Sequence, residues 1–247
     1  MSSIDKIISD DEAVSTFHEL LEKKCSNLEY LESLSSKYLR NRESITDAVV
    51  DSIIHTYVGT ACWEVNNWLR RTDKRINNRN CLLLFTKLMV WALSKNPTTS
   101  TKNLCRNENY SEEAIRFFSD NQGSVVKLLS FWSTSQNWQP VEERLMYKIS
   151  RSEKTRAYDI TKIIKVIQPG RIHENEAVYL PETCFNVKKV ETQSNTIYLE
   201  ECKCMAKFEL IKNGYRHVEG ESLGNDRLQG NIFTDLYPEF DPELYEG

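Results

Sequence analysis

The stretch Glu174-Asn-Glu-Ala-Val-Tyr-Leu-Pro-Glu-Thr-Cys-Phe-Asn-Val-Lys-Lys-Val190 decides the fold of the second half of the chain. Residues 177–180 and 185–190 each read as a short β-strand, because they are rich in β-branched and aromatic residues and a proline separates them. Glu174 and Glu176 enter the first of these strands. Alternate residues of a strand share a face, so both carboxylates are expected on one side of a sheet.

Further short strands are predicted on both sides of this stretch, at residues 102–106, 125–131, 145–149 and 196–211. Asn213-Gly214 predicts a turn after the last of them. Between the first two strands, Ser111 followed by Glu112 and Glu113 predicts the start of a helix that runs through Phe118.

The first hundred residues are predicted to be helical, because apolar residues recur there at helical spacing. The predicted helices carry Val14, Phe17, Leu20 and Leu21; Leu28, Leu31, Leu34 and Tyr38; the long segment Ile45 to Leu69; and the apolar run Cys81 to Leu93. Pro97 ends the last helix. The chain is therefore divided into a helical lobe at 1–98, a strand-rich core at 99–218 and an acidic tail at 219–247, which holds eight acidic residues and one basic one.

The composition is that of an ordinary globular protein. A chain of 247 residues, 40% apolar and 28% charged, can bury a sizeable core. No run of 18 apolar residues is present, so a membrane-spanning helix is not expected. The net charge of −4 offers no basic field for a polyphosphate, which makes nucleic-acid binding an unfavourable interpretation.

The seven cysteines are an odd number without a repeating spacing, and the first residues show no signal-peptide pattern. We therefore expect reduced thiols, in a cytoplasmic protein or in one secreted into a host cytosol. Cys202 and Cys204 would share one strand face and are interpreted as core thiols. Neither a second pair nor a histidine pair stands at zinc spacing, so no metal is predicted.

Three short features follow one another in the strand-rich half: Arg106 at the end of a strand, Phe131-Trp-Ser-Thr-Ser135, and the pair Glu174 and Glu176. Each pattern is weak alone, since Glu219-Gly-Glu221 and Ser33-Leu-Ser35 repeat the spacings elsewhere. Their order and strand context give them weight.

Together these features resemble the active-site signature of the mono-ADP-ribosyltransferases, in the clade named for an arginine, a serine motif and a glutamate pair. Tyr57, Asn66 or Asn67 and Trp68-Leu-Arg70 are also similar to the helical lobe of arginine-modifying members, so the resemblance covers about residues 45 to 200. It implies an α+β fold, with a helical lobe packed on two antiparallel β-sheets and NAD in the cleft between the sheets.

The resemblance also implies roles for individual residues. Arg106 would hold a phosphate of NAD through its planar fork. Ser133 would orient the catalytic carboxylate of Glu176, which would stabilise the ribosyl cation left when nicotinamide departs. Further contacts to the cofactor would come from Asn107, Trp132, Thr134 and Ser135. Most members carry an aromatic residue and a glycine where Cys105 and Asn107 flank the arginine.

The first carboxylate of the pair, Glu174, would meet the acceptor. A glutamate there suits a guanidinium, which stays protonated and needs an anion to orient it, so the acceptor is predicted to be an arginine of a target protein. His173 and residues 168–171 would lie where that target docks.

Other functions remain open from the sequence. The chain could be a transferase with a serine, threonine or nucleic-acid acceptor, an inactive transferase-like module that binds a protein, or a helical scaffold, which its strands make least favoured. A bacterial effector acting in a host cell and a transferase acting on proteins of its own cell have the same sequence features.

Overall fold

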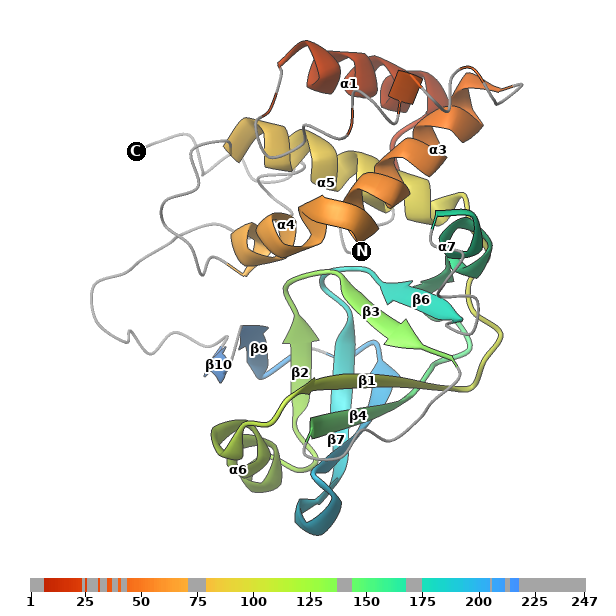
Figure 1. Ribbon diagram of the computed structural model, residues 1–247. Helices are drawn as coiled ribbons and strands as arrows, with labels where there is room; N and C mark the ends of the chain where they lie inside the picture. The colour runs from red at the N-terminus through yellow and green to blue at the C-terminus, as the bar shows by residue number, and fades with distance from the viewer. Residues whose placement is uncertain are drawn as a thin grey trace. The chain divides into compact units, whose positions relative to one another are not determined.

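A computed structural model describes residues 7–23, 25, 31, 35, 36, 40, 44–70, 79–136, 144–167, 175–204, 206–211 and 214–217 (Figure 1). The described residues divide into a helical unit, which comprises those up to Leu69 and those from 79 to Lys95, and a sheet unit, which comprises Arg70 and those from Asn96 to His217. Several predictions lie outside the described residues: Glu174, His173, the loop at 168–171, the acidic tail and most of the second helical stripe.

The helical unit contains α1 (Asp10–Glu22), α3 (Ile45–Thr56), η3 (Tyr57–Ala61), α4 (Cys62–Leu69) and α5 (Arg79–Ser94). Serine side chains begin two of these helices, as Ser9 Oγ accepts from the backbone N–H of Glu12 at 3.2 Å and Ser44 Oγ accepts from that of Asp47 at 3.4 Å. The predicted helix from Ile45 to Leu69 is confirmed as a continuous helical segment, with a π-helical stretch at its centre that periodicity did not predict.

Helix α5 packs against α1 and α3, and its apolar residues form much of this unit's core. Phe17, Ile53, Phe85 and Trp91 are all essentially inaccessible to solvent. The Trp91 indole N–H donates to Asp10 Oδ1 at 3.1 Å, and Lys95 forms an ion pair with the same carboxylate. The start of α1 is thereby fixed to the end of α5.

The prediction that the cysteines are reduced is wrong for two of the seven. Cys25 and Cys81 form a disulfide across 56 residues, with their Cα atoms 6.2 Å apart. Sequence periodicity describes neighbours within one helix and does not report which cysteines meet across the chain. Cys204 does not share a strand face with Cys202, because the strand ends at Cys202, and the Cys204 side chain is exposed.

In the sheet unit, the described strands are β1 (Asn103–Asn109), β2 (Val125–Leu128), β3 (Trp132–Ser135), β4 (Arg144–Ser150), β5 (Ala157–Asp159), β6 (Glu176–Tyr179), β7 (Cys184–Glu191), β8 (Thr196–Cys202), β9 (Phe208–Ile211) and β10 (Gly214–His217). They follow the spatial order β10-β9-β2-β7-β8-β4-β1-β3-β6-β5. The pairs β2–β9 and β4–β8 are parallel, and the other pairs are antiparallel. The short helices of this unit are α6 (Glu112–Asp120), α7 (Thr161–Ile167) and η5 (Thr192–Ser194).

The sheet bends sharply between β1 and β3, where a single residue pair, Cys105 with Ser135, joins seven strands to the remaining three (Figure 1). Side chains from both parts meet in one core. The rings of Trp132 and Tyr147 lie 4.9 Å apart, and those of Tyr179 and Phe185 lie 5.1 Å apart. The α+β fold class is confirmed, although two of the pairings are parallel and the expected two sheets form one hydrogen-bonded order.

Some predicted strands differ from the observed ones. The strand predicted at 125–131 is β2, which ends at Leu128, and the serine motif lies on the separate strand β3, while residues 196–211 form β8 and β9. The sequence reasoning missed β5 and α7, which are too short for a clear period. Helix α6 begins as predicted, because Ser111 Oγ accepts from the backbone N–H of Ala114 at 3.1 Å.

Candidate functional site

Arg106 is held on β1 by three groups. Its Nε donates to Glu108 Oε1 at 2.7 Å, and its Nη1 donates to the backbone carbonyl oxygen of Ser133 at 2.7 Å. The guanidinium carbon also lies 5.4 Å from the ring centre of Trp132, within the range of a cation–π contact. The arginine is therefore oriented before any ligand arrives, and a quarter of its side chain stays exposed.

Glu108 completes this arrangement. Its Oε1 accepts a second hydrogen bond, from the indole N–H of Trp132 at 3.1 Å. Burial opposes ionisation, but the charge and hydrogen bond of Arg106, the Trp132 hydrogen bond and the charge of Arg70 together hold the pKa of Glu108 below its ordinary value. The carboxylate is thus ionised at neutral pH, while 34% of the side chain remains exposed.

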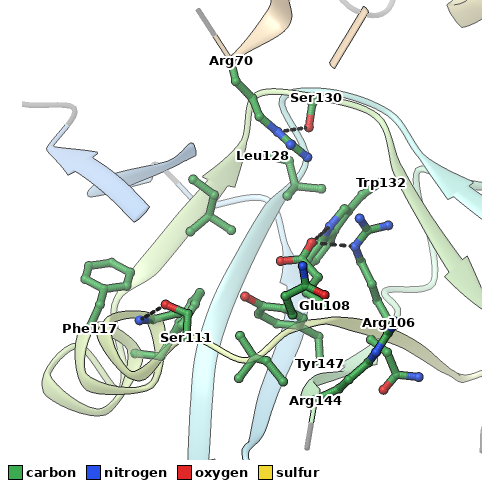
Figure 2. Close-up of a pocket in the computed structure, with 16 residues that line it drawn as sticks. Arg70, Arg106, Glu108, Ser111, Phe117, Leu128, Ser130, Trp132, Arg144 and Tyr147 are labelled. Atoms are coloured by element: carbon green, nitrogen blue, oxygen red, sulfur yellow. Dashed lines mark hydrogen bonds and ion pairs between the residues drawn. The ribbon is translucent and has the colours of Figure 1, made fainter. Parts of the chain in front are cut away.

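A cavity of about 310 Å³ opens beside this pair (Figure 2). Three arginines line it, Arg70, Arg106 and Arg144, and Glu108 is the acidic residue among the lining side chains. Arg70 is fixed by a hydrogen bond from its Nε to Ser130 Oγ at 2.8 Å. A concave site with oriented guanidinium groups is suited to a phosphate or another anion.

The cavity continues from the arginines toward helix α6, where its wall becomes apolar. Phe117 and Phe118 of α6 and Leu128 of β2 form this part, whereas Tyr147 of β4 lines the cavity beside its strand partner Arg106. Figure 2 shows Phe117 on the side of the cavity away from Arg106. Arg70 and Arg106 therefore stand at one end of this space and the phenylalanines of α6 at the other, where Arg144 pairs with Asn109.

The serine motif lies on β3, between the arginine strand and the glutamate strand. Ser135 pairs with Glu176, and Ser133 pairs with Val178. Directly paired residues of antiparallel strands share a face, so Ser133, Ser135 and Glu176 lie on one face of this part of the sheet. Trp132 and Thr134 lie on the other face, where Thr134 Oγ1 donates to the carbonyl oxygen of Ala177 at 2.8 Å.

The backbone around Glu176 is fixed from both sides. Gln136 donates its N–H to the carbonyl oxygen of Asn175 at 2.7 Å, and Ile160 donates to that of Glu176 at 3.0 Å. The Gln136 side chain is anchored in turn, since the hydroxyls of Thr99 and Thr101 both donate to its Oε1 at 2.7 Å. Glu176 itself is 8% exposed, at the first position of β6.

The structure brings together part of the predicted site. Of the predicted residues, Arg106, Asn107 and Trp132 line the cavity, and Arg106 contacts the backbone of Ser133. Among the described residues, Ser133, Thr134, Ser135 and Glu176 stand beside this cavity on β3 and β6 and are not part of its lining. Sequence reasoning missed Glu108, Arg70 and Arg144. Glu108 could have been suspected, because it stands two residues after Arg106 and so shares its strand face.

Within the described part of the chain, no cluster of three or more metal-ligating side chains is found. No described helix is long and apolar enough to cross a membrane.

No protein-family model matches the sequence, and no curated protein matches it. Solved structures do match the fold. The ADP-ribosyltransferase Vis, a toxin from Vibrio splendidus, aligns with a TM-score of 0.53 at 15% identity, over 87% of this chain and 99% of Vis. The chain has the ADP-ribosyltransferase fold.

Two more structures share this ADP-ribosyltransferase fold at similar distance. A truncated form of the type III effector XopAI from Xanthomonas axonopodis pv. citri gives a TM-score of 0.50 at 16% identity, over 79% of this chain and 90% of the other. Exoenzyme S from Pseudomonas aeruginosa gives 0.50 at 18%, over 78% and 88%. In the ADP-ribosyltransferase fold of this chain, a single strand, β3, separates the arginine strand β1 from the glutamate strand β6.

Proposed function

We propose that this chain is a mono-ADP-ribosyltransferase that uses NAD and modifies an arginine of a target protein. The observation that carries the proposal is the hydrogen bond from Arg106 to the backbone of Ser133, because it joins the arginine strand to the strand that pairs with Glu176. The fold and the order of the three motifs support the same function.

The proposed reaction begins with NAD bound by its diphosphate at Arg106, with Arg70 as a second guanidinium of the same cavity. Arg106 uses Nε on Glu108 and Nη1 on Ser133, so Nη2 is available to a phosphate. Exoenzyme S has been solved with carba-NAD, which supports NAD as the substrate class of the fold.

In the chemical step, the bond between nicotinamide and ribose breaks, and nicotinamide leaves with the bonding electron pair. The ribosyl cation that forms is stabilised by the carboxylate of Glu176, which is largely buried. A fixed negative charge that faces the cation where little water is present lowers the energy of that state. Ser133 and Ser135, on the same face as Glu176, orient that carboxylate.

The acceptor is proposed to be a guanidinium that attacks the cation and releases a proton. Glu174 stands two residues before Glu176 in the sequence and would orient the acceptor through its negative charge. Vis has been solved with agmatine, a guanidine compound, which supports an arginine-type acceptor. Vis is a toxin and XopAI is a type III effector, which supports secretion of this chain into a host cytosol.

Nicotinamide release and labelling of lysate proteins from labelled NAD test this proposal, with the wild type and Glu176→Gln. Loss of the fixed charge is expected to lower nicotinamide release about 100-fold or more. Glu174→Gln is expected to retain NAD cleavage and lose protein labelling. The matched control is Glu153→Gln, which removes an exposed carboxylate on the turn after β4.

The outcomes separate the alternatives. A wild type that neither cleaves NAD nor labels protein favours the inactive binding module. Labelling that survives Glu174→Gln, or that mass spectrometry assigns to serine, threonine or nucleic acid, contradicts the arginine acceptor. An unaffected Glu176→Gln variant contradicts the site.

A further inference from the structure

The Glu108 carboxylate has no part in the proposed chemistry, yet it lies in the middle of the arginine-lined cavity. Figure 2 shows it between the indole of Trp132 and the guanidinium of Arg106. An ionised carboxylate repels a diphosphate. Glu108 is therefore expected to bind a different part of the ligand. Its position along the neighbouring strand indicates which part.

Contacts to β3 place three charged groups in order. Glu176 pairs with Ser135 at one end of this strand, Arg106 contacts Ser133 in the middle, and Glu108 contacts Trp132 at the other end. Along β3, the contact of Arg106 therefore falls between those of the two glutamates, although the Glu176 side chain starts on the other face of the strand from the Trp132 ring. A dinucleotide with its nicotinamide ribose on the Glu176 side and its diphosphate at Arg106 would extend its adenosine half toward Glu108.

The shape of the cavity agrees with this direction. Beyond Glu108, the lining follows the chain from β1 into α6, through Asn109 and Ser111 to Phe117 and Phe118. Aromatic and apolar side chains can pack against a purine, whereas the guanidinium groups of Arg106 and Arg70 suit phosphate. The adenosine ribose then falls between these regions, at Glu108.

We infer that Glu108 determines the choice of dinucleotide: its carboxylate accepts hydrogen bonds from the adenosine ribose hydroxyls and excludes a dinucleotide that carries a 2′-phosphate. This inference rests on the proposed function, which fixes the direction of the ligand. An acidic residue that accepts from a ribose 2′-hydroxyl selects NAD over NADP in unrelated folds for the same physical reason. A 2′-phosphate would place about two negative charges against the carboxylate.

The positive charge of Arg144 would favour the opposite preference, for NADP. Arg144 also lines the cavity, and its side chain is exposed. If a 2′-phosphate met Arg144 in place of Glu108, the protein would favour NADP. The ionised state of Glu108 supports exclusion, since its pKa is held below the ordinary value.

The test compares binding of NAD and NADP by calorimetry, and nicotinamide release from each, for the wild type and Glu108→Gln. Glutamine keeps an oxygen that can accept from Arg106 and Trp132, so the change removes mainly the charge. Wild type is expected to bind NAD about tenfold or more tightly than NADP, and the variant to lose most of that preference through stronger NADP binding. The matched control, Glu113→Gln, removes an exposed carboxylate from α6 and should leave the ratio unchanged.

A second measurement changes the ligand. NAD that lacks the adenosine 2′-hydroxyl should bind the wild type about tenfold more weakly than NAD, because a hydrogen bond to a charged group is lost. The penalty should shrink in Glu108→Gln. An unchanged NAD to NADP ratio in that variant, a wild type that prefers NADP, or no penalty for the deoxy compound overturns the inference while leaving NAD cleavage intact. A wild type that neither binds nor cleaves NAD overturns the proposed function as well.

Discussion

The guanidinium of Arg106 and the backbone carbonyl of Ser133 are 2.7 Å apart, so a side chain of β1 contacts β3 just beyond the single residue pair that joins these strands. Where two strands share one paired residue, a side-chain bond across the gap fixes their separation. The arginine thus serves the structure of the bend as well as the proposed phosphate site.

Arg106→Lys should separate these two roles. Lysine keeps the charge but cannot hold Glu108, Ser133 and a phosphate together, because it lacks the planar fork. We expect KM for NAD to rise about 10- to 100-fold, with a smaller change in kcat. Steady-state nicotinamide release measures both, and Arg116→Lys on the exposed face of α6 is the control. An unchanged KM would remove Arg106 from the substrate site.

Gln136 should act as a positioning residue for Glu176. Gln136→Ala removes the acceptor of two threonine hydroxyls, and Thr99 is buried, so we expect a loss of about 1 to 3 kcal/mol in the free energy of unfolding. Since the backbone of Gln136 bonds to Asn175, the start of β6 should loosen and kcat should fall more than KM changes.

Gln136→Glu supplies the comparison for that effect, because it keeps an acceptor for both hydroxyls. It should restore much of kcat and of the stability. A kcat that falls equally in both variants would show that the threonine contacts do not position Glu176. Chemical denaturation and nicotinamide release provide the two readouts.

The sequence predicted elements with a strong period and missed those defined by contacts across the fold. The helix from Ile45 to Leu69 and the cap at Ser111 were found, because both depend on neighbours in the chain. The break between β2 and β3 was missed, since the apolar run through Phe131 shows no change of period where the sheet bends.

The residues of the candidate site show the same contrast between local patterns and contacts across the fold. Arg106 and Trp132 were proposed from a resemblance in motif order, and both line the cavity. Arg70 and Arg144 are separated from Arg106 by 36 and 38 positions in the numbering (106 − 70 and 144 − 106), so only the bent sheet shows that they share it. A pattern of local spacing carries no such information.

Glu108 should make stability depend on pH in the acid range. Its pKa in the folded protein lies below the ordinary value of 4.5, so its ion pair with Arg106 stabilises the fold fully above that value. The contribution is lost as pH falls through the lowered folded pKa. The difference in unfolding free energy between wild type and Glu108→Gln should therefore be constant above about pH 5.5 and shrink below pH 4.5. A difference that grows on acidification would contradict the depressed pKa.

The disulfide between Cys25 and Cys81 should stabilise the helical unit. It closes a loop of 56 residues, so reduction, or the change Cys81→Ser, is expected to cost about 2 to 4 kcal/mol by releasing the unfolded chain. Melting followed by circular dichroism, with and without dithiothreitol, measures this loss. Cys204→Ser is the control, because Cys204 is an exposed free thiol. If reduction leaves wild-type melting unchanged while free thiols rise by two per chain, the bond exists without stabilising the unit. If the thiol count does not rise, the bond is absent in solution.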